Sequence, residues 1–250
     1  RRRKACAWGR RTVRVRDETL RELMDDPQCD EQALLRTVRR FTVVNRAVAG
    51  WGAIYRSRLR PYLRTRADAQ RDEPVRILDV GCGGGDVTRD LARRAHSDGF
   101  AVEICGIDPD PRCLSIATSQ PPEPGVTFRG AYAADLVDAG EQFDVVVSNH
   151  VLHHLSRDQL HELLTHTDAL GAELALHNDI ARSKTAWGLY AVGILPVAPG
   201  TFLLTDGLRS IRRSYTVAEL QREVPRGWTV TPPAPFRVLA TRGPEGPGDR

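Results

Sequence analysis

The sequence contains no long apolar run. None of its 250 residues belongs to a stretch approaching the roughly 20 apolar residues that a membrane-spanning helix needs. The apolar stretch 189–197 is too short, and prolines follow it. The basic N-terminus also lacks the apolar core of a secretory signal. We therefore expect a soluble protein without a membrane partner.

Paired cysteines are also missing. The five cysteines are odd in number, and they lack the spacing of a zinc site or of a secreted disulfide framework. Reduced cysteines and a cytoplasmic location are the expectation. Seven histidines are present, but no spacing among them specifies a metal, so no metal site is predicted.

Acidic residues are absent from positions 1–16, which hold eight basic residues. The chain has a net charge of +4, and without this segment 28 basic residues face 32 acidic ones. The basicity therefore belongs to the N-terminus, and nucleic-acid binding by the remainder is not expected. We expect residues 1–29 to be a basic tail, of which residues 1–16 are either solvated or a contact arm for an acidic partner.

A strand, a glycine loop and a helix occupy residues 75–95. Branched apolar residues predict a buried strand at 75–80, and Val87, Leu91 and Ala95 then recur at helical spacing. Asp86 either caps this helix or favours its first turn. The glycines between strand and helix let a ligand approach bare backbone and the N–H groups of the helix N-terminus.

Two familiar loops of this kind do not fit. The nicotinamide fingerprint needs glycine at the position of Asp86, and a P-loop needs Gly-Lys-Ser/Thr where this chain has Gly85-Asp86-Val87. An aspartate at the strand end suits an ammonium group better than a phosphate. The pattern is acidic-x-Gly-x-Gly-x-Gly, formed by Asp79, Gly81, Gly83 and Gly85.

This pattern resembles motif I of the class I S-adenosylmethionine-dependent methyltransferases. The resemblance implies that S-adenosyl-L-methionine is the cofactor and that the loop, including Cys82, cradles its methionine part. It also implies that Asp79 lies near the cofactor's amino group.

Strands and helices alternate along the rest of the chain, which predicts an α/β, Rossmann-like fold with helices on both faces of a mostly parallel sheet. Helices are expected near 86–97, 110–118, 157–169 and 216–224. Seven strands are expected, near 75–80, 101–107, 126–129, 143–149, 172–179, 228–231 and 236–241. The resemblance implies that the last strand is antiparallel and inserted beside the sixth.

The methyltransferase domain is expected to span residues 74–242, with 181–215 as a substrate-side insertion. Residues 30–73 are predicted to form an N-terminal helical lid, of which the polar stretch from 64 onward is a linker. A connection as long as 181–215 is more often functional than idle. Residues 243–250 are rich in glycine and proline and are expected to be disordered.

Ligands collect beyond the carboxyl ends of parallel strands, so the residues there are candidate cofactor contacts. Asp108, with Pro109 beside it, can accept hydrogen bonds from both ribose hydroxyls; a helix N-cap is its alternative role, although Asp110 offers a start of its own. Asp135 is predicted near the adenine amino group, although related sequences often place aspartate where this chain has Ala131. Further cofactor contacts are predicted at Ala134, Leu136, Asn149 and His150.

The sequence lacks the signatures of several methyltransferase classes, and these absences exclude some kinds of methyl acceptor. The Asn/Asp-Pro-Pro-Tyr/Phe signature of nucleic-acid amino-methyltransferases is missing at the end of the fourth strand, as are the Pro-Cys pair of cytosine methylation and the two-glutamate loop of arginine methyltransferases. A small molecule is therefore the expected partner, and the oligomeric state stays open. The segments "HNDIARS" and "TDGLRSIRRSYTVAEL" resemble bacterial methyltransferases that act on phenolic or quinone-like metabolites.

An oxygen acceptor must lose a proton, and histidine has a suitable pKa for a base. His150, His154 and His177 are the catalytic candidates, although packing is an alternative role for His153 and His154. Substrate contacts are predicted at Asn45, Trp51, Tyr55, Asn178, Arg209 and Arg213. The leading hypothesis is an enzyme that methylates the oxygen of a phenolic or polyketide-type aromatic metabolite. C-methylation of a quinone-type ring, or a cofactor-binding module without catalysis, are the alternatives.

Overall fold

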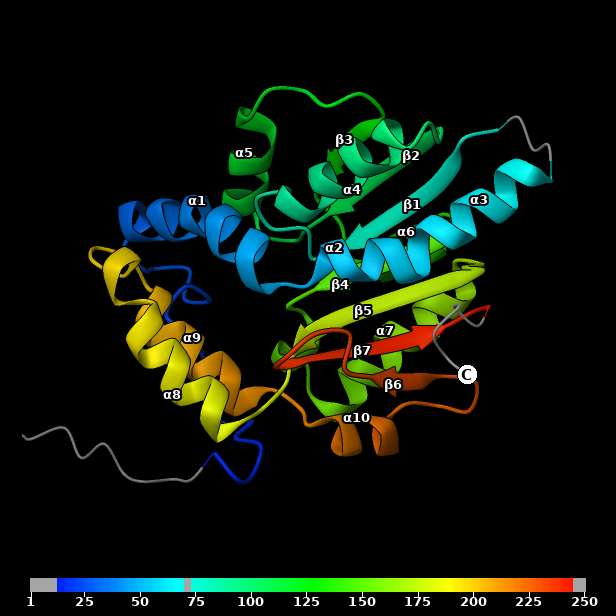
Figure 1. Cartoon of the computed structure of the whole chain (residues 1–250). Coiled ribbons are helices and arrows are strands. Elements are labelled where there is room, and N and C mark those ends of the chain that lie inside the picture. Colours follow the sequence, from blue (N-terminus) through cyan, green and yellow to red (C-terminus); the bar gives the residue numbers. More distant parts are fainter. Residues whose placement is uncertain (1–12, 70–72, 245–250) are drawn as a thin grey trace, which may run out of the picture.

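A seven-stranded sheet forms the centre of the computed structural model, which describes residues 13–69 and 73–244 (Figure 1). The strands are β1 (Val75–Val80), β2 (Val102–Ile107), β3 (Val126–Arg129), β4 (Val145–Asn149), β5 (Leu174–Ile180), β6 (Thr229–Thr231) and β7 (Arg237–Arg242). Their order in the sheet is β3-β2-β1-β4-β5-β7-β6. Neighbours from β3 to β5 are parallel, whereas β7 is antiparallel to both β5 and β6. The predicted fold class and the insertion of the last strand are confirmed.

Helices cover both faces of the sheet because successive strand residues point to opposite sides. Ile77 of β1 packs with the helices on one face, and Leu78 packs with those on the other. The first face carries α2 (Trp51–Ile54), the π-helix η1 (Tyr55–Leu59), α3 (Arg60–Asp68) and α4 (Asp86–Ser97). The second face carries α6 (Ala133–Asp138), α7 (Arg157–Ala169) and α10 (Val217–Glu223).

The remaining helices lie around the carboxyl ends of the strands or beside the sheet. They are α1 (Glu31–Val48), α5 (Pro111–Ser119), the 3-10 turn η2 (Leu152–His154), α8 (Lys184–Gly193), the 3-10 turn η3 (Leu195–Val197) and α9 (Leu203–Arg213). In Figure 1, α1 extends from the sheet toward the α8–α9 pair, which stands apart from the sheet. The predicted insertion 181–215 is therefore largely helical, and α6 was not predicted.

The stretch predicted as a linker from residue 64 onward is partly wrong. Helix α3 continues to Asp68 because Arg66 is fixed by two carboxylates, with 2.7 Å to Asp144 and 2.9 Å to Glu173. Polar composition alone did not reveal these partners. The helical segment 51–68, which comprises α2, η1 and α3, is therefore part of the layer of helices over the sheet.

The prediction that residues 1–29 form a tail is wrong for residues 13–29. This segment packs against α9, where the Asp206 carboxylate accepts hydrogen bonds from the backbone N–H groups of Leu23 (2.8 Å) and Met24 (3.0 Å). The side chain of Glu22, which precedes these two residues, is only 4% exposed. Residues 1–12, which carry most of the basic cluster, and 245–250 of the expected C-terminal tail lie outside the described residues.

Among the described residues, no helix combines the length and the apolar character needed to cross a bilayer. The four described cysteines, Cys29, Cys82, Cys105 and Cys113, are all free thiols.

Candidate cofactor and acceptor site

The glycine loop after β1 forms an open backbone cradle. Gly81, Gly83 and Gly85 have φ angles of 70°, 54° and 74°, a region that favours glycine. Gly85 is the N-cap of α4, so Asp86 lies in the first turn. A Cβ on Gly83 would meet no described atom within 4 Å, which leaves its surface free for a ligand. Cys82 is buried, and burial raises the pKa of its thiol.

Gly85 and Gly140 offer a matched test of this cradle. Both have positive φ, but only a Cβ on Gly85 would collide, at 2.5 Å from Phe128 Cζ and 2.6 Å from Arg89 Nη1. Gly140→Ala is expected to cost about 1 kcal/mol of unfolding free energy, the backbone penalty alone. Gly85→Ala is expected to cost a further ~1–3 kcal/mol through overpacking. Equal costs in urea unfolding would contradict the close packing under the loop.

Asp79 ends β1 as a buried carboxylate with one free oxygen. Thr88 donates a 2.6 Å hydrogen bond to Oδ2, whereas Oδ1 has no hydrogen-bond partner among the described residues. Burial raises the pKa of this carboxyl to about 7, an effect that the Thr88 hydrogen bond opposes and the charges of Asp86 and Asp108 reinforce. A buried, unpaired oxygen of this kind fits a cationic donor such as an ammonium group.

Asp108 joins the end of β2 to the glycine loop. Its carboxylate accepts 2.9 Å hydrogen bonds from the backbone N–H groups of Gly83 and Asp110 across Pro109. The helix cap is supplied by Asp110, which accepts from the backbone of Arg112, so Asp108 is not the N-cap of α5. Asp108 therefore lies beside the cradle, as a ribose contact would require.

The predicted adenine contacts fit less well. Asp135 accepts a 2.7 Å hydrogen bond from the Tyr132 backbone N–H in a capping box of α6. Leu136 is fully buried in the core, and only Ala134 of the predicted apolar pair is partly exposed. The Leu136 side chain therefore packs in the core and does not reach the strand ends. The Asp135 carboxylate caps α6, a role that the prediction for this residue did not include.

The end of β4 carries a polar cluster that includes one residue the sequence did not reveal. Arg237 of β7 is 3% exposed, and it donates to Asn149 Oδ1 at 3.0 Å and to Asn178 Oδ1 at 3.3 Å. It also lies 3.2 Å from His150 Nε2. Burial lowers the pKa of Arg237 to about 10, so its guanidinium is charged at neutral pH.

This contact fixes the tautomer of His150, which stands in a left-handed conformation with φ 62°. Because arginine can only donate, Nε2 of His150 accepts and Nδ1 carries the proton. Burial, together with the charge of Arg237, lowers the pKa of His150 well below its usual value. The basic nitrogen of His150 is therefore already engaged, and its Nδ1–H group is a hydrogen-bond donor.

His177 does not reach the strand ends. Its side chain is fully buried, with Nδ1 2.8 Å from Ser148 Oγ and Nε2 3.2 Å from Thr167 Oγ1, and it stacks on Trp228. Burial lowers the pKa of His177 to about 3. Both ring nitrogens are thus occupied in the core on the far side of the sheet, and we do not retain a catalytic role for this residue.

His153 and His154 meet Glu22 beside the same strand end. Nε2 of His153 lies 3.3 Å from Glu22 Oε1, and Nε2 of His154 lies 3.8 Å from Glu22 Oε2. His153 donates from Nδ1 to Asp179 at 2.7 Å. Burial lowers the pKa of His153, but the charge of Asp179, the hydrogen bond to Asp179 and the charge of Glu22 outweigh burial and raise that pKa to about 9.

The predicted substrate contacts are divided by the structure. Asn45 of α1 donates a 3.0 Å hydrogen bond to Asp86, which places it at the glycine loop. Trp51 and Tyr55 are buried in the core over the sheet, and the Tyr55 hydroxyl bonds to Asp98 after the far end of α4. Trp51 nevertheless lines a pocket with Asn45 and Asp86, whereas Tyr55 is not brought to the site.

Three further predicted contacts have structural partners. Asn178 is fully buried and donates to the Ala49 carbonyl at 2.8 Å. Arg213 is 7% exposed and donates to the carbonyls of His153 and His154, so it is a buried structural residue. Arg209 donates to the Arg21 carbonyl at 2.7 Å. Arg213 thereby fixes the loop that carries His153 and His154, and Arg209 fixes the N-terminal segment that carries Glu22.

Residues 77–170 match the sequence model of a family described as "Methyltransferase domain". The similar curated proteins include the ubiquinone biosynthesis O-methyltransferases of Azorhizobium caulinodans, 40% identical over 84 residues, and of Rhizobium leguminosarum bv. trifolii, 35% identical over 86 residues. These alignments cover 33% and 34% of this chain. They span about a third of the relatives' own lengths, 31% and 32%.

Solved structures share the fold at low identity. The plantazolicin methyltransferase BpumL, solved in complex with SAH, superposes with a TM-score of 0.56 at 12% identity, covering 86% of this chain and 95% of that one. The DszA carbon methyltransferase gives a TM-score of 0.54 at 21% identity, covering 75% and 52%. The chain thus shares the fold of these methyltransferases, and residues 77–170 match the methyltransferase-domain model.

Proposed function

We propose that the chain is an S-adenosylmethionine-dependent methyltransferase that methylates the oxygen of a small phenolic or polyketide-type molecule. The observation that carries the proposal is the buried Asp79 carboxylate with its unpaired Oδ1 beside the positive-φ glycines. A cytoplasmic location, supported by the free thiols, belongs to the same proposal.

The residues present fit this cofactor. S-adenosylmethionine supplies an electrophilic methyl group when bound. In our proposal Asp79 pairs with its ammonium group and Asp108 accepts from its ribose hydroxyls. Helix α1 helps to exclude water, because a Cβ on Gly84 would lie only 2.8 Å from Val38, which shows how closely the helix covers the loop. The ubiquinone O-methyltransferases support oxygen as the acceptor atom.

Product analysis tests the proposal. The purified chain is incubated with methyl-labelled S-adenosylmethionine and a panel of alkylresorcinols, hydroxyquinones and other phenols, and products are assigned by NMR. A new methyl group on a phenol oxygen is expected. A methyl group on a ring carbon would replace O-methylation with C-methylation. Cofactor binding without turnover of any acceptor would favour a binding module.

His150 is proposed to contact the acceptor through its Nδ1–H group. His150→Asn removes the imidazole while tolerating the left-handed backbone better than alanine. The loss of one hydrogen bond predicts a fall in kcat/KM of about tenfold, with the Kd for S-adenosylhomocysteine unchanged. The matched control is His161→Ala, which removes an exposed histidine bonded to the Glu223 carbonyl. Unchanged kcat/KM in His150→Asn would remove this residue from the acceptor site.

A further inference from the structure

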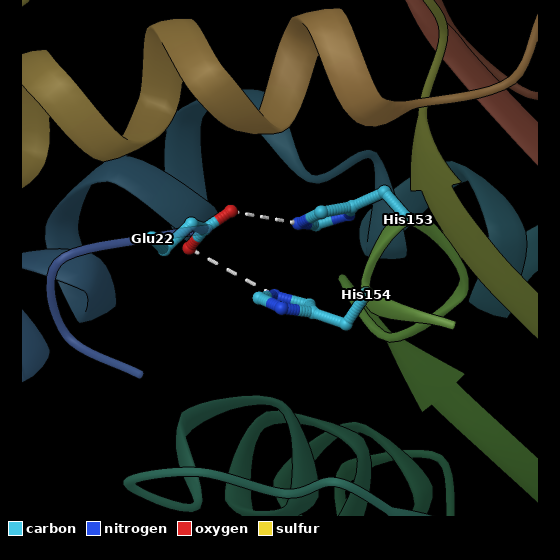
Figure 2. Close-up of side chains that lie close together, drawn as sticks. All are labelled: Glu22, His153 and His154. Carbon is cyan, nitrogen blue, oxygen red and sulfur yellow. Dashed lines mark ion pairs between the residues drawn. The ribbon is translucent and has the colours of Figure 1, made fainter. Parts of the chain in front are cut away.

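Glu22, His153 and His154 converge from distant parts of the chain. Figure 2 shows the Glu22 side chain entering from the N-terminal segment and the two imidazole rings reaching toward it from the loop after β4. One ligand atom from each of the three residues lies within 4.8 Å of the other two. The carboxylate and His153 are 4% and 1% exposed, and His154 is 31% exposed.

The spacing within this cluster differs from that of ordinary hydrogen bonds. Nε2 of His153 is buried and has no hydrogen-bond partner among the described residues, although Glu22 Oε1 is only 3.3 Å away. Two donors bound to one tetrahedral ion at about 2.1 Å are roughly 3.4 Å apart. The 3.3 Å distance from His153 Nε2 to Glu22 Oε1 is close to that separation, and the 3.8 Å distance from His154 Nε2 runs to the other oxygen of the same carboxylate, Oε2.

Hydrogen bonds behind the cluster orient both imidazoles. Asp179 accepts from Nδ1 of His153, which leaves Nε2 as the ring nitrogen that faces Glu22, an arrangement typical of metal-binding histidines. Nδ1 of His154 lies 3.5 Å from the Asp25 carboxylate. Ser210 donates to Glu22 Oε1 at 2.5 Å. Each of the three side chains therefore has a polar partner that fixes its direction.

We propose that Glu22, His153 and His154 bind one divalent transition-metal ion, Zn²⁺ in the first instance, and leave one coordination position open. Two imidazoles and one carboxylate form a donor set that suits zinc, and three protein ligands with an open fourth position are characteristic of catalytic rather than structural zinc sites. His154 is the most exposed of the three ligands, so solvent reaches the cluster at this residue.

The ion would take the place of a histidine base, an extension that rests on the proposed function. An acceptor phenol bound at the open position loses its proton to solvent because the ion stabilises the phenolate. The phenolate oxygen then forms a bond to the methyl carbon, and the carbon–sulfur bond breaks with its electron pair moving to sulfur. This chemistry fits a site where the basic nitrogen of His150 is engaged by Arg237 and His177 is buried in the core.

Metal binding is tested without reference to activity. The tag-free full chain is stripped with a chelator, dialysed and titrated with ZnCl₂ by calorimetry, and its metal content is measured by mass spectrometry. One Zn²⁺ per chain is expected, and Co²⁺ in its place is expected to give the visible absorption of a four-coordinate ion.

Two variants and their controls assign the ligands. Glu22→Gln preserves the size of the side chain, and His154→Ala removes a partly exposed ring, so neither is expected to unfold the chain. Each should weaken Zn²⁺ binding by about 100-fold or more and abolish the Co²⁺ spectrum. Glu18→Gln, an exposed carboxylate in the same segment, and His161→Ala should bind as the unmodified chain does.

The outcomes separate this inference from the proposed function. No stoichiometric Zn²⁺ in the unmodified chain, or equal affinity in Glu22→Gln and Glu18→Gln, would overturn the metal site. S-adenosylhomocysteine binding is measured on the same stripped chain. If the nucleoside binds and zinc does not, only the metal inference fails; if zinc binds and the nucleoside does not, only the proposed function fails.

Discussion

Replacement of Asp79 by asparagine is expected to weaken S-adenosylhomocysteine binding by about 10- to 100-fold. The carboxylate Oδ1 is buried and unpaired, so an ammonium group bound there gains a charge-assisted hydrogen bond worth ~1.5–3 kcal/mol. Asparagine keeps the shape and the Thr88 contact but not the charge. Isothermal titration calorimetry at pH 7.5 measures the loss.

The same group makes cofactor affinity depend on pH. Burial raises the pKa of Asp79 from 3.8 to about 7, so the folded protein without cofactor holds a proton there below pH 7. An ammonium ligand favours the ionised form. Affinity should therefore rise with pH and level off above 7, with about tenfold weaker binding at pH 6 than on the plateau. This slope should be absent from Asp79→Asn.

Stability should respond in the opposite direction. Between pH 3.8 and 7 the folded state binds more protons at Asp79 than the unfolded state does, so this residue's contribution to stability falls as pH rises through that window. Above pH 7 the buried charge is present in full, and Asp79→Asn is expected to unfold at a higher temperature than the unmodified chain.

Asp138→Asn is the control for both effects, because Asp138 is exposed on the last turn of α6. It should change neither the Kd nor the unfolding temperature. If Asp79→Asn bound the nucleoside as tightly as Asp138→Asn, Asp79 would not contact the ammonium group.

Local patterns were sufficient to predict the sheet and one half of the site. Each strand is a short apolar run bounded by turn residues, and the glycine loop with Asp79 lies within seven consecutive residues, 79–85. Asp108 was predictable because the ends of neighbouring parallel strands meet at one edge of the sheet. The positions of these residues follow from strand register alone.

The acceptor side depends on contacts between distant segments. Glu22 meets His153 across 131 positions, and Arg237 reaches Asn149 across 88, so no spacing in the sequence indicates either pairing. His177 was predicted at the site from its position in the sequence but lies elsewhere. It belongs to the same strand as Asn178 but faces the opposite side of the sheet. A one-residue step along a strand separates a core histidine from a residue at the site.

The buried carboxylate of Asp179 is expected to contribute several kcal/mol to the fold. It accepts hydrogen bonds from the backbone N–H of His153 at 2.8 Å and from Nδ1 of the same residue at 2.7 Å, and it is 2% exposed. Asp179→Ala leaves two buried donors unpaired and removes a counter-charge from His153. Breaking a buried pair from one side costs ~3–5 kcal/mol, or roughly 6–20 °C in unfolding temperature for a chain of this size.

Asp168→Ala is the matched control, since Asp168 pairs with Arg242 at 3.1 Å on the surface, where both side chains are partly exposed. An exposed ion pair contributes at most about 1 kcal/mol, so its loss should shift the unfolding temperature by only a few degrees. Asp179→Asn should fall between the two, because the amide oxygen still accepts from one donor. Indistinguishable unfolding temperatures for Asp179→Ala and Asp168→Ala would mean that the loop carrying His153 and His154 is held by its other contacts, foremost the two carbonyl bonds from Arg213.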